Sequence, residues 1–112
     1  MSESPEPVLA VLVTAPSESV AARLARGAVE SGLAACGNLV PGVRSIYAWN
    51  GEICDDAEVL IVFKTTAAGF EALRAHLVGA HPYDTPEVVA LSVEAGHGPY
   101  LDWVRTMVGG SR

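Results

Sequence analysis

The chain has 112 residues, which is enough for one domain and too few for two independent cores. Half of the residues are hydrophobic and 18% are charged, so the composition excludes a disordered chain and supplies more apolar side chains than so small a core needs. Thirteen acidic residues against seven Lys and Arg give a net charge of −6. This balance argues against nucleic acid and anionic membranes as partners, because both attract basic surfaces.

The first seven residues, MSESPEP, are polar and acidic, and they lack the basic and apolar segments of a signal peptide. We expect a disordered lead over residues 1–7, a folded domain over 8–108 and a flexible tail over 109–112. No apolar run approaches the roughly 20 residues that span a bilayer. The expected location is therefore the cytoplasm, where the two cysteines stay reduced.

The first elements follow from valine content and from helix signals. Residues 8–14 (VLAVLVT) are almost continuously apolar, as in a strand covered on both faces. Ser17 is a suitable N-cap for the helix that follows, and Gly32 can take the positive φ that often ends one. The apolar stripe of this helix consists of Val20, Leu24 and Ala28.

A long hairpin is the most informative prediction. Residues 34–49 read as a strand with a bulge at Pro41-Gly42, and residues 52–65 read as its antiparallel partner. Asn50-Gly51 between them is typical of a two-residue type I′ turn. Each arm would measure roughly 45 Å at about 3.3 Å per residue, whereas a domain of this size has a radius of gyration of about 13 Å. The tip must project, and we expect other copies of the chain to cover it, since a free hairpin of this length invites aggregation.

The second half repeats the order strand, helix, strand. A helix is predicted over residues 67–78 with Gly79 past its end, a strand over 87–93, and a last helix from Pro99. The resulting fold class is α+β, with a ferredoxin-like βαββαβ pattern plus a C-terminal helix. Its antiparallel sheet would place the first and third strands at the centre. A doubly wound sheet is less consistent with a two-residue hairpin.

Three groups of side chains on the hairpin could carry chemistry. The turn pairs Tyr47 with Cys54 and brings Cys36 near Thr65, so the two cysteines lie too far apart for an intrachain disulfide. Lys64, the only lysine, could bind an anion or pair with a carboxylate, or it could be an ordinary strand-end residue. One face of the third strand carries a patch that could hold a divalent cation or could simply be solvated: Glu52, Cys54, Asp56 and Glu58.

The segment His81–Glu87 (HPYDTPE) is the densest cluster of functional side chains. Its two prolines stiffen the backbone and push His81 and Thr85 toward extended geometry, which could pre-organise a site or merely stop a helix. One histidine is a weak metal signal, and neither His76 nor His97 is spaced to assist it. Motifs for dinucleotides, phosphate loops, zinc proteases and serine hydrolases are absent from the sequence.

Taken together, four segments resemble the CutA divalent-cation tolerance family, in the right order and over residues 8–107. The resemblance implies a ferredoxin-like subunit over residues 8–108, a homotrimer sealed by the long hairpins, a bacterial cytoplasmic location and a role in tolerance of copper and other metals. The segments are ACGNLVPGVRSIYAWNGEI (residues 35–53), FKTT (63–66) with the preceding Glu58, HPYDTPE (81–87) and YLDW (100–103).

The family resemblance also shows one departure. Copper ligands proposed for some bacterial members are a cysteine in the first strand and two adjacent histidines before the proline of HPY. In this chain those positions are Val13, Ala80 and His81, so one of the three ligands remains.

We therefore expect a trimer that is not an enzyme and that handles divalent cations, copper among them, at clefts between its subunits. His81 and Glu87 would bind metal. Trp49, Glu58, Lys64 and Tyr83 would complete the cleft. One alternative is a sensor resembling the trimeric PII proteins, in which Lys64 binds an anionic metabolite. Another is an enzyme with His81 and Glu87 as acid and base, although no nucleophile accompanies them.

Overall fold

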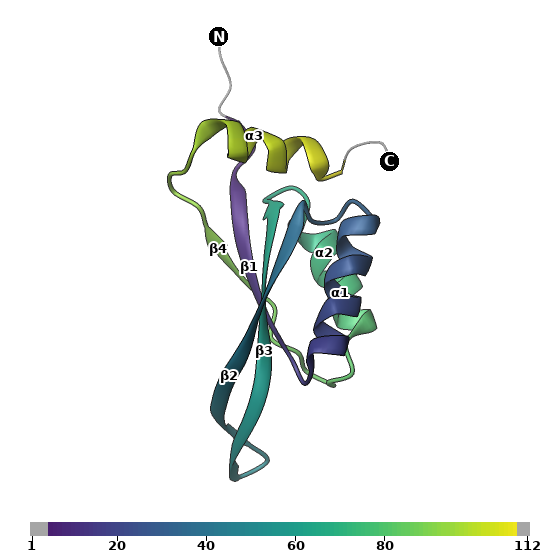
Figure 1. Cartoon of the computed structure of the whole chain (residues 1–112), viewed down its shortest axis with the longest axis vertical. Helices are drawn as coiled ribbons and strands as arrows, with labels where there is room; N and C mark the ends of the chain where they lie inside the picture. The colour runs from purple at the N-terminus through teal and green to yellow at the C-terminus, as the bar shows by residue number, and fades with distance from the viewer. Residues whose placement is uncertain (1–4, 110–112) are drawn as a thin grey trace.

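The computed structural model describes residues 5–109 and shows one four-stranded antiparallel sheet with three helices (Figure 1). The strand order is β2-β3-β1-β4, so the first and third strands are central, as predicted. The elements in chain order are β1 Val8–Ala15, α1 Glu18–Glu30, β2 Cys36–Trp49, β3 Glu52–Thr66, α2 Phe70–Ala80, β4 Val89–Ser92 and α3 Gly98–Met107.

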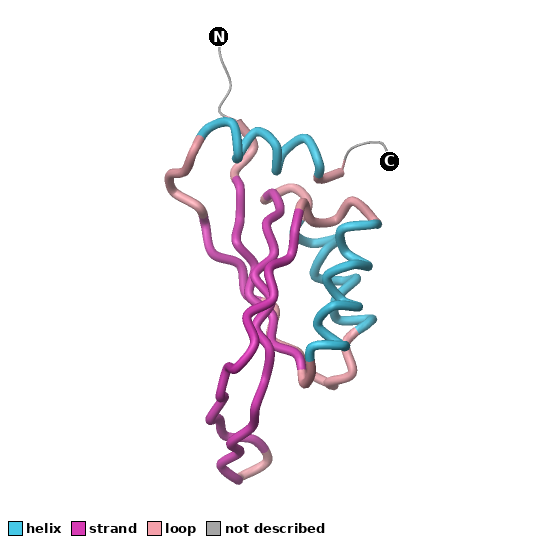
Figure 2. Tube along the Cα trace, in the orientation of Figure 1, coloured by secondary structure: helices cyan, strands magenta, loops and turns pink. Residues whose placement is uncertain are grey.

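One face of the sheet packs against α1 and α2 (Figure 2). The core between these layers is made by alternate residues of the central strands, such as Val11 and Phe63, and by the apolar stripes of the two helices, such as Leu24 and Leu77. All four are at most 1% exposed. Ser17 caps α1 by accepting a hydrogen bond from the Val20 N–H, as the sequence predicted.

The hairpin of β2 and β3 extends well past the helices, and the molecule measures 55 × 27 × 22 Å (Figure 1). Asn50 and Gly51 have φ values of 51° and 77°, as a type I′ turn requires. The predicted pairing holds from the turn up to Val43, which faces Glu58. A bulge at Pro41-Gly42 then shifts the register by one residue, so that Cys36 faces Lys64 rather than Thr65.

The bounds of α2 and β4 both differ from the prediction. α2 begins at Phe70 rather than at residue 67. Gly79 lies inside α2, which ends at Ala80 because Pro82 forces His81 into an extended backbone. β4 covers Val89–Ser92 rather than residues 87–93, and it pairs with β1 only from Leu9 to Leu12.

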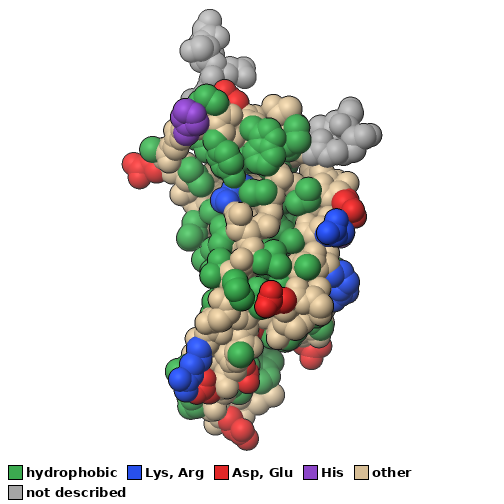
Figure 3. Space-filling view, viewed as in Figure 1, with side chains coloured by type: hydrophobic (Ala, Val, Ile, Leu, Met, Phe, Trp, Pro, Cys, Tyr) green, Lys and Arg blue, Asp and Glu red, His purple; other side chains and the backbone are tan. Residues whose placement is uncertain are grey.

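The other face of the sheet is largely open. α3 lies across the end of the sheet where β3 ends, and its Val104 packs with Val8 and Ala35 in a second small cluster. Beyond it, Val40, Val89 and Leu91 remain 42%, 47% and 50% exposed. Figure 3 shows hydrophobic side chains gathered over the strands between α3 and the hairpin. One copy of the chain therefore leaves an apolar sheet face uncovered.

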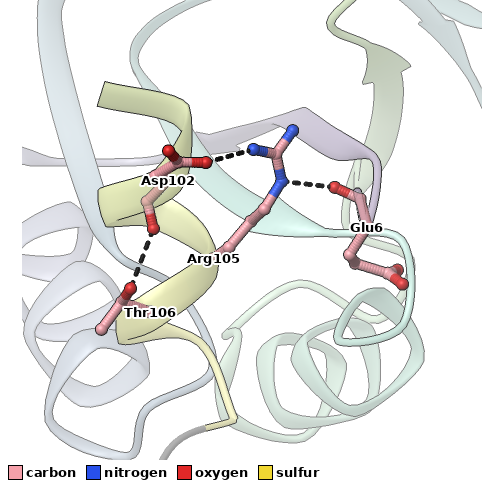
Figure 4. A network of polar contacts seen from close by, with 4 residues as sticks. All are labelled: Glu6, Asp102, Arg105 and Thr106. Atoms are coloured by element: carbon pink, nitrogen blue, oxygen red, sulfur yellow. Dashed lines mark hydrogen bonds and ion pairs between the residues drawn. The ribbon is translucent and has the colours of Figure 1, made fainter. Parts of the chain in front are cut away.

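The segment before β1 is tied to α3 and to the loop after β3. Arg105 donates from Nε to the carbonyl oxygen of Glu6 at 2.7 Å and pairs with Asp102 at 2.8 Å (Figure 4). The Glu6 carboxylate accepts from the Ala68 N–H, and the Pro7 carbonyl accepts from the Ala67 N–H. Of the expected disordered lead, residues 1–4 lie outside the described residues, as does most of the expected tail, residues 110–112. Glu6 and Pro7 are held against the domain by these bonds.

Candidate functional site

A groove of about 680 Å³ lies between the hairpin and the loop that follows α2. The hairpin contributes its aromatic residues and one buried carboxylate, and the loop contributes an aromatic ring and two exposed carboxylates. These residues are Tyr47, Trp49 and Glu58 from the hairpin, and Tyr83, Asp84 and Glu87 from the loop.

His81 holds the loop against the end of β1. Its Nε2 lies 2.8 Å from the Thr14 carbonyl oxygen, and its Nδ1 accepts a hydrogen bond from the Tyr83 N–H at 3.1 Å. Because Nδ1 accepts, this pattern assigns the ring proton to Nε2, which donates to Thr14. The imidazole is 8% exposed, and its centroid lies 4.6 Å from that of the Tyr83 ring. His81 thus positions Tyr83 at the groove without lining the groove itself.

This arrangement also explains why β4 is short. Beyond Leu12, the Thr14 carbonyl at the edge of β1 accepts a hydrogen bond from the His81 ring instead of from a residue of β4. The loop between His81 and β4 can then turn toward the hairpin, where Tyr83 and Glu87 reach the groove.

Glu58 is the buried carboxylate of the groove, and only 8% of the residue is exposed. Its Oε2 accepts a hydrogen bond of 2.7 Å from the Tyr83 hydroxyl. Burial, together with this bond to a carboxylate, raises the pKa of Tyr83 above its usual value, so the phenol stays protonated as the donor.

The hairpin forms the wall of the groove that lies opposite the loop after α2. The Tyr47 hydroxyl donates to Asp56 at 2.5 Å, and this hydrogen bond raises the pKa of Tyr47 to about 12. Trp49, two residues further along the same face of β2, is half exposed. Arg44 lines the groove as well, but its guanidinium holds Asp55 through two bonds of 2.8 and 2.6 Å. That pairing lowers the pKa of Asp55.

Lys64 lies apart from the groove in one copy of the chain. It sits near the other end of β3, where its Nζ donates to the Asn38 Oδ1 at 2.5 Å and lies 3.8 Å from the Cys36 Sγ. The Tyr100 hydroxyl lies 3.5 Å from the same sulfur, and this contact, followed by burial, raises the pKa of Tyr100 to about 12. Cys36 and Cys54 are both free thiols, in agreement with the prediction that no disulfide joins them.

The geometry bears on metal binding as well. Both ring nitrogens of His81 are engaged, so a metal ion could bind the ring only by displacing Thr14 or the Tyr83 N–H. Val13, at a family ligand position, is fully buried in the core. Between residues 5 and 109, no cluster of three or more His, Cys, Asp or Glu side chains is arranged to hold a metal ion.

Four of the six predicted site residues, Trp49, Glu58, Tyr83 and Glu87, therefore line one groove, with His81 behind them. Tyr47 was not predicted as a site residue. The signal was present, because Tyr47 precedes Trp49 by two residues on a strand, and such residues share a face.

Comparison with known proteins places this chain in a family. The family described as "CutA1 divalent ion tolerance protein" matches residues 9–107. The divalent-cation tolerance protein CutA of Thermus thermophilus is 48% identical over 99 residues, which are 88% of this chain and 96% of that protein. The chain belongs to the CutA1 family.

Other CutA1 relatives agree with this assignment. Human protein CutA is 50% identical over 101 residues, which are 90% of this chain and 56% of the human protein. The solved CutA1 structure from Thermus thermophilus superimposes with a TM-score of 0.89 at 47% identity, over 91% of this chain and 99% of that one. The structure from Oryza sativa gives a TM-score of 0.90 at 40% identity, over 95% of this chain and 97% of that one.

Proposed function

We propose that this protein is a homotrimer that takes part in divalent-cation tolerance and binds a small ligand in the groove, at the junction between copies. The family and the names of its relatives support the link to divalent cations. The observation that carries the assembly is the apolar surface that one copy leaves exposed. On the hairpin, Ile46 and Ile53 are 65% and 75% exposed, and the open sheet face adds Leu91 at 50%.

Burial of this surface by other copies would remove both the apolar sheet face and the unprotected hairpin from water. The groove is lined by the same hairpin that the partners would cover, so assembly and ligand binding would be linked.

Two classes of ligand are candidates for this site, a divalent cation and a small organic molecule. Copper or another divalent cation bound by His81 and Glu87 stays a prediction. The engagement of both ring nitrogens of His81 favours a structural role for this histidine instead. We therefore propose a small organic ligand for the groove.

Two further expectations stay predictions. The cytoplasmic location is one, since relatives carry the words chloroplastic and periplasmic in their names. The other is that the protein is not an enzyme.

Within the described part of the chain, no helix combines the length and apolarity needed to cross a membrane.

Sedimentation equilibrium and calorimetric titration test this proposal. We expect a mass of three chains at micromolar concentration, and heat on addition of a groove ligand that is lost in Trp49→Leu. A mass of one chain would overturn the assembly. Titration with Cu²⁺ and Zn²⁺ tests the metal alternative, which requires binding by the wild type and its loss in His81→Ala.

A second candidate function is a PII-like sensor of an anionic metabolite. It is favoured by Lys64, whose ammonium has no carboxylate partner among the ion pairs of residues 5–109. Titration with a panel of nucleotides and phosphates would test it. The candidate requires binding that Lys64→Met abolishes and that Lys64→Arg retains, because only the second variant keeps the charge.

A further inference from the structure

We propose that the groove selects an organic cation, namely a primary or quaternary ammonium that carries a short apolar group. This inference rests on the proposed function, in which the groove is a ligand site, and it adds the chemical class of that ligand.

The first support is the burial of Glu58 without a cationic partner in the described part of the chain. A carboxylate that is 8% exposed is normally paired with a cation, because burial removes the water that stabilises its charge. Among the described residues, none of the ion pairs includes Glu58. The Tyr83 hydroxyl donates to one of its oxygens, but a phenol carries no positive charge to pair with a carboxylate. Glu58 lines the groove, so a positively charged ligand there could pair with it.

The second support is the balance of charge around Glu58. Asp84 and Glu87 also line the groove, and both are exposed. The positive lining side chain, Arg44, is already held in two hydrogen bonds to Asp55. The groove therefore has a negative potential that attracts cations and opposes anionic ligands.

The third support separates an organic cation from a metal ion. Divalent metal ions require several oxygen, nitrogen or sulfur ligands, and the described residues contain no group of three that could supply them. The groove instead presents three aromatic side chains, Tyr47, Trp49 and Tyr83. Aromatic faces attract ammonium groups through their quadrupole, and Trp is the strongest of them. Tyr83 bonds directly to Glu58, and Tyr47 and Trp49 line the same groove, so a carboxylate and aromatic surface are both available there to an alkylammonium.

The test compares two probes of the same shape, choline and 3,3-dimethylbutan-1-ol, in which a carbon replaces the charged nitrogen. Isothermal titration of the full-length protein should show that choline binds at least about tenfold more tightly than the neutral alcohol. Glu58→Gln, which keeps an acceptor for Tyr83, should weaken choline binding by about tenfold or more. Glu30→Gln at the end of α1 makes the same change of charge outside the groove, and it should leave binding unchanged.

Trp49→Leu provides a second variant, since Trp49 is half exposed on the hairpin and lies outside the core. It should also weaken choline binding, and circular dichroism would verify that both variants fold. If Glu58→Gln does not fold, Trp49→Leu decides the result.

The outcomes separate this inference from the proposed function. Tighter binding of the neutral alcohol or of AMP than of choline would overturn the cation class. If Trp49→Leu weakened that tighter binding, the groove would remain a ligand site for another class of molecule. Choline affinity that is equal in the wild type and in a folded Glu58→Gln would also overturn it. Absence of binding by probes of every charge would overturn both proposals.

Discussion

At the scale of single residues, the groove is organised by phenols that donate to carboxylates. Tyr83 bonds to Glu58 and Tyr47 bonds to Asp56, and in each pair the phenol is the donor. His81 supports the first pair from behind through its contacts with Thr14 and Tyr83. Both ring nitrogens of His81 are thus engaged within the fold, and metal binding by this residue stays a prediction.

We predict that His81→Ala lowers the free energy of unfolding by about 1–3 kcal/mol, since it leaves the Thr14 carbonyl and the Tyr83 N–H without their partner. Urea denaturation at a fixed protein concentration would measure the change. His97→Ala is the matched control, because His97 is exposed and makes no side-chain cap bond to α3. Equal midpoints for the two variants would contradict the structural role.

We also predict that none of the three tyrosines ionises near pH 10 in the folded protein. Tyr47 and Tyr100 have pKa values of about 12, and the pKa of Tyr83 is raised as well. The stabilisation from these protonated phenols is fully present below pH 10, the unfolded pKa, and is lost as the pH rises through about 12. Absorbance at 295 nm would follow phenolate formation while circular dichroism monitors folding. Asp56→Asn should lower the pKa of Tyr47, and a folded wild type with a phenolate midpoint near 10 would refute the prediction.

At the scale of elements, glycine at two positions has opposite effects on stability. Gly51 closes the hairpin turn with a φ of 77°, a value that favours glycine over other residues. Gly79 lies in α2, where an added Cβ would have no atom within 4 Å. The hairpin turn requires the positive φ that glycine adopts easily, whereas in α2 glycine only lowers the stability of the helix.

Replacement of each glycine by alanine should therefore shift stability in opposite directions. Gly51→Ala should destabilise the protein by about 1 kcal/mol, because alanine resists positive φ. Gly79→Ala should stabilise it by about 0.4–1 kcal/mol through its greater helix propensity. Thermal unfolding of both variants against the wild type provides the measurement. A Gly51→Ala variant as stable as the wild type would show that the turn does not require glycine, and a destabilised Gly79→Ala would contradict the prediction for α2.

The elements that could be predicted were those specified by neighbouring residues. Asn50-Gly51 determined the hairpin and its register as far as the bulge, and Ser17 marked the start of α1. The error at β4 arose where distant residues decide, whereas the error at the end of α2 arose from the neighbouring Pro82. The limit of β4 depends on the bond from His81 to Thr14, which are 67 residues apart in the chain. The same holds for the groove, since its walls come from the hairpin and from the loop after α2.

At the scale of the whole molecule, the two sides of the sheet have different exposure. α1 and α2 pack against one side, whereas the other leaves Val40, Val89 and Leu91 partly exposed. An apolar patch of this kind on a small protein indicates an interface. Because the groove lies along the hairpin that would join the copies, any change that separates the copies should also affect ligand binding.

We predict that Leu91→Arg separates the copies. Leu91 is half exposed in one copy, and on the interface a charged side chain would be buried without a partner, which costs several kcal/mol. Val78→Arg makes the same change at a residue of α2 that is 40% exposed, on the side of the sheet opposite the interface, and it should leave assembly intact. Light scattering coupled to gel filtration would report the two masses. We expect one chain for Leu91→Arg and the wild-type mass for Val78→Arg. If Leu91→Arg kept the wild-type mass, the open sheet face would not be the surface that joins the copies.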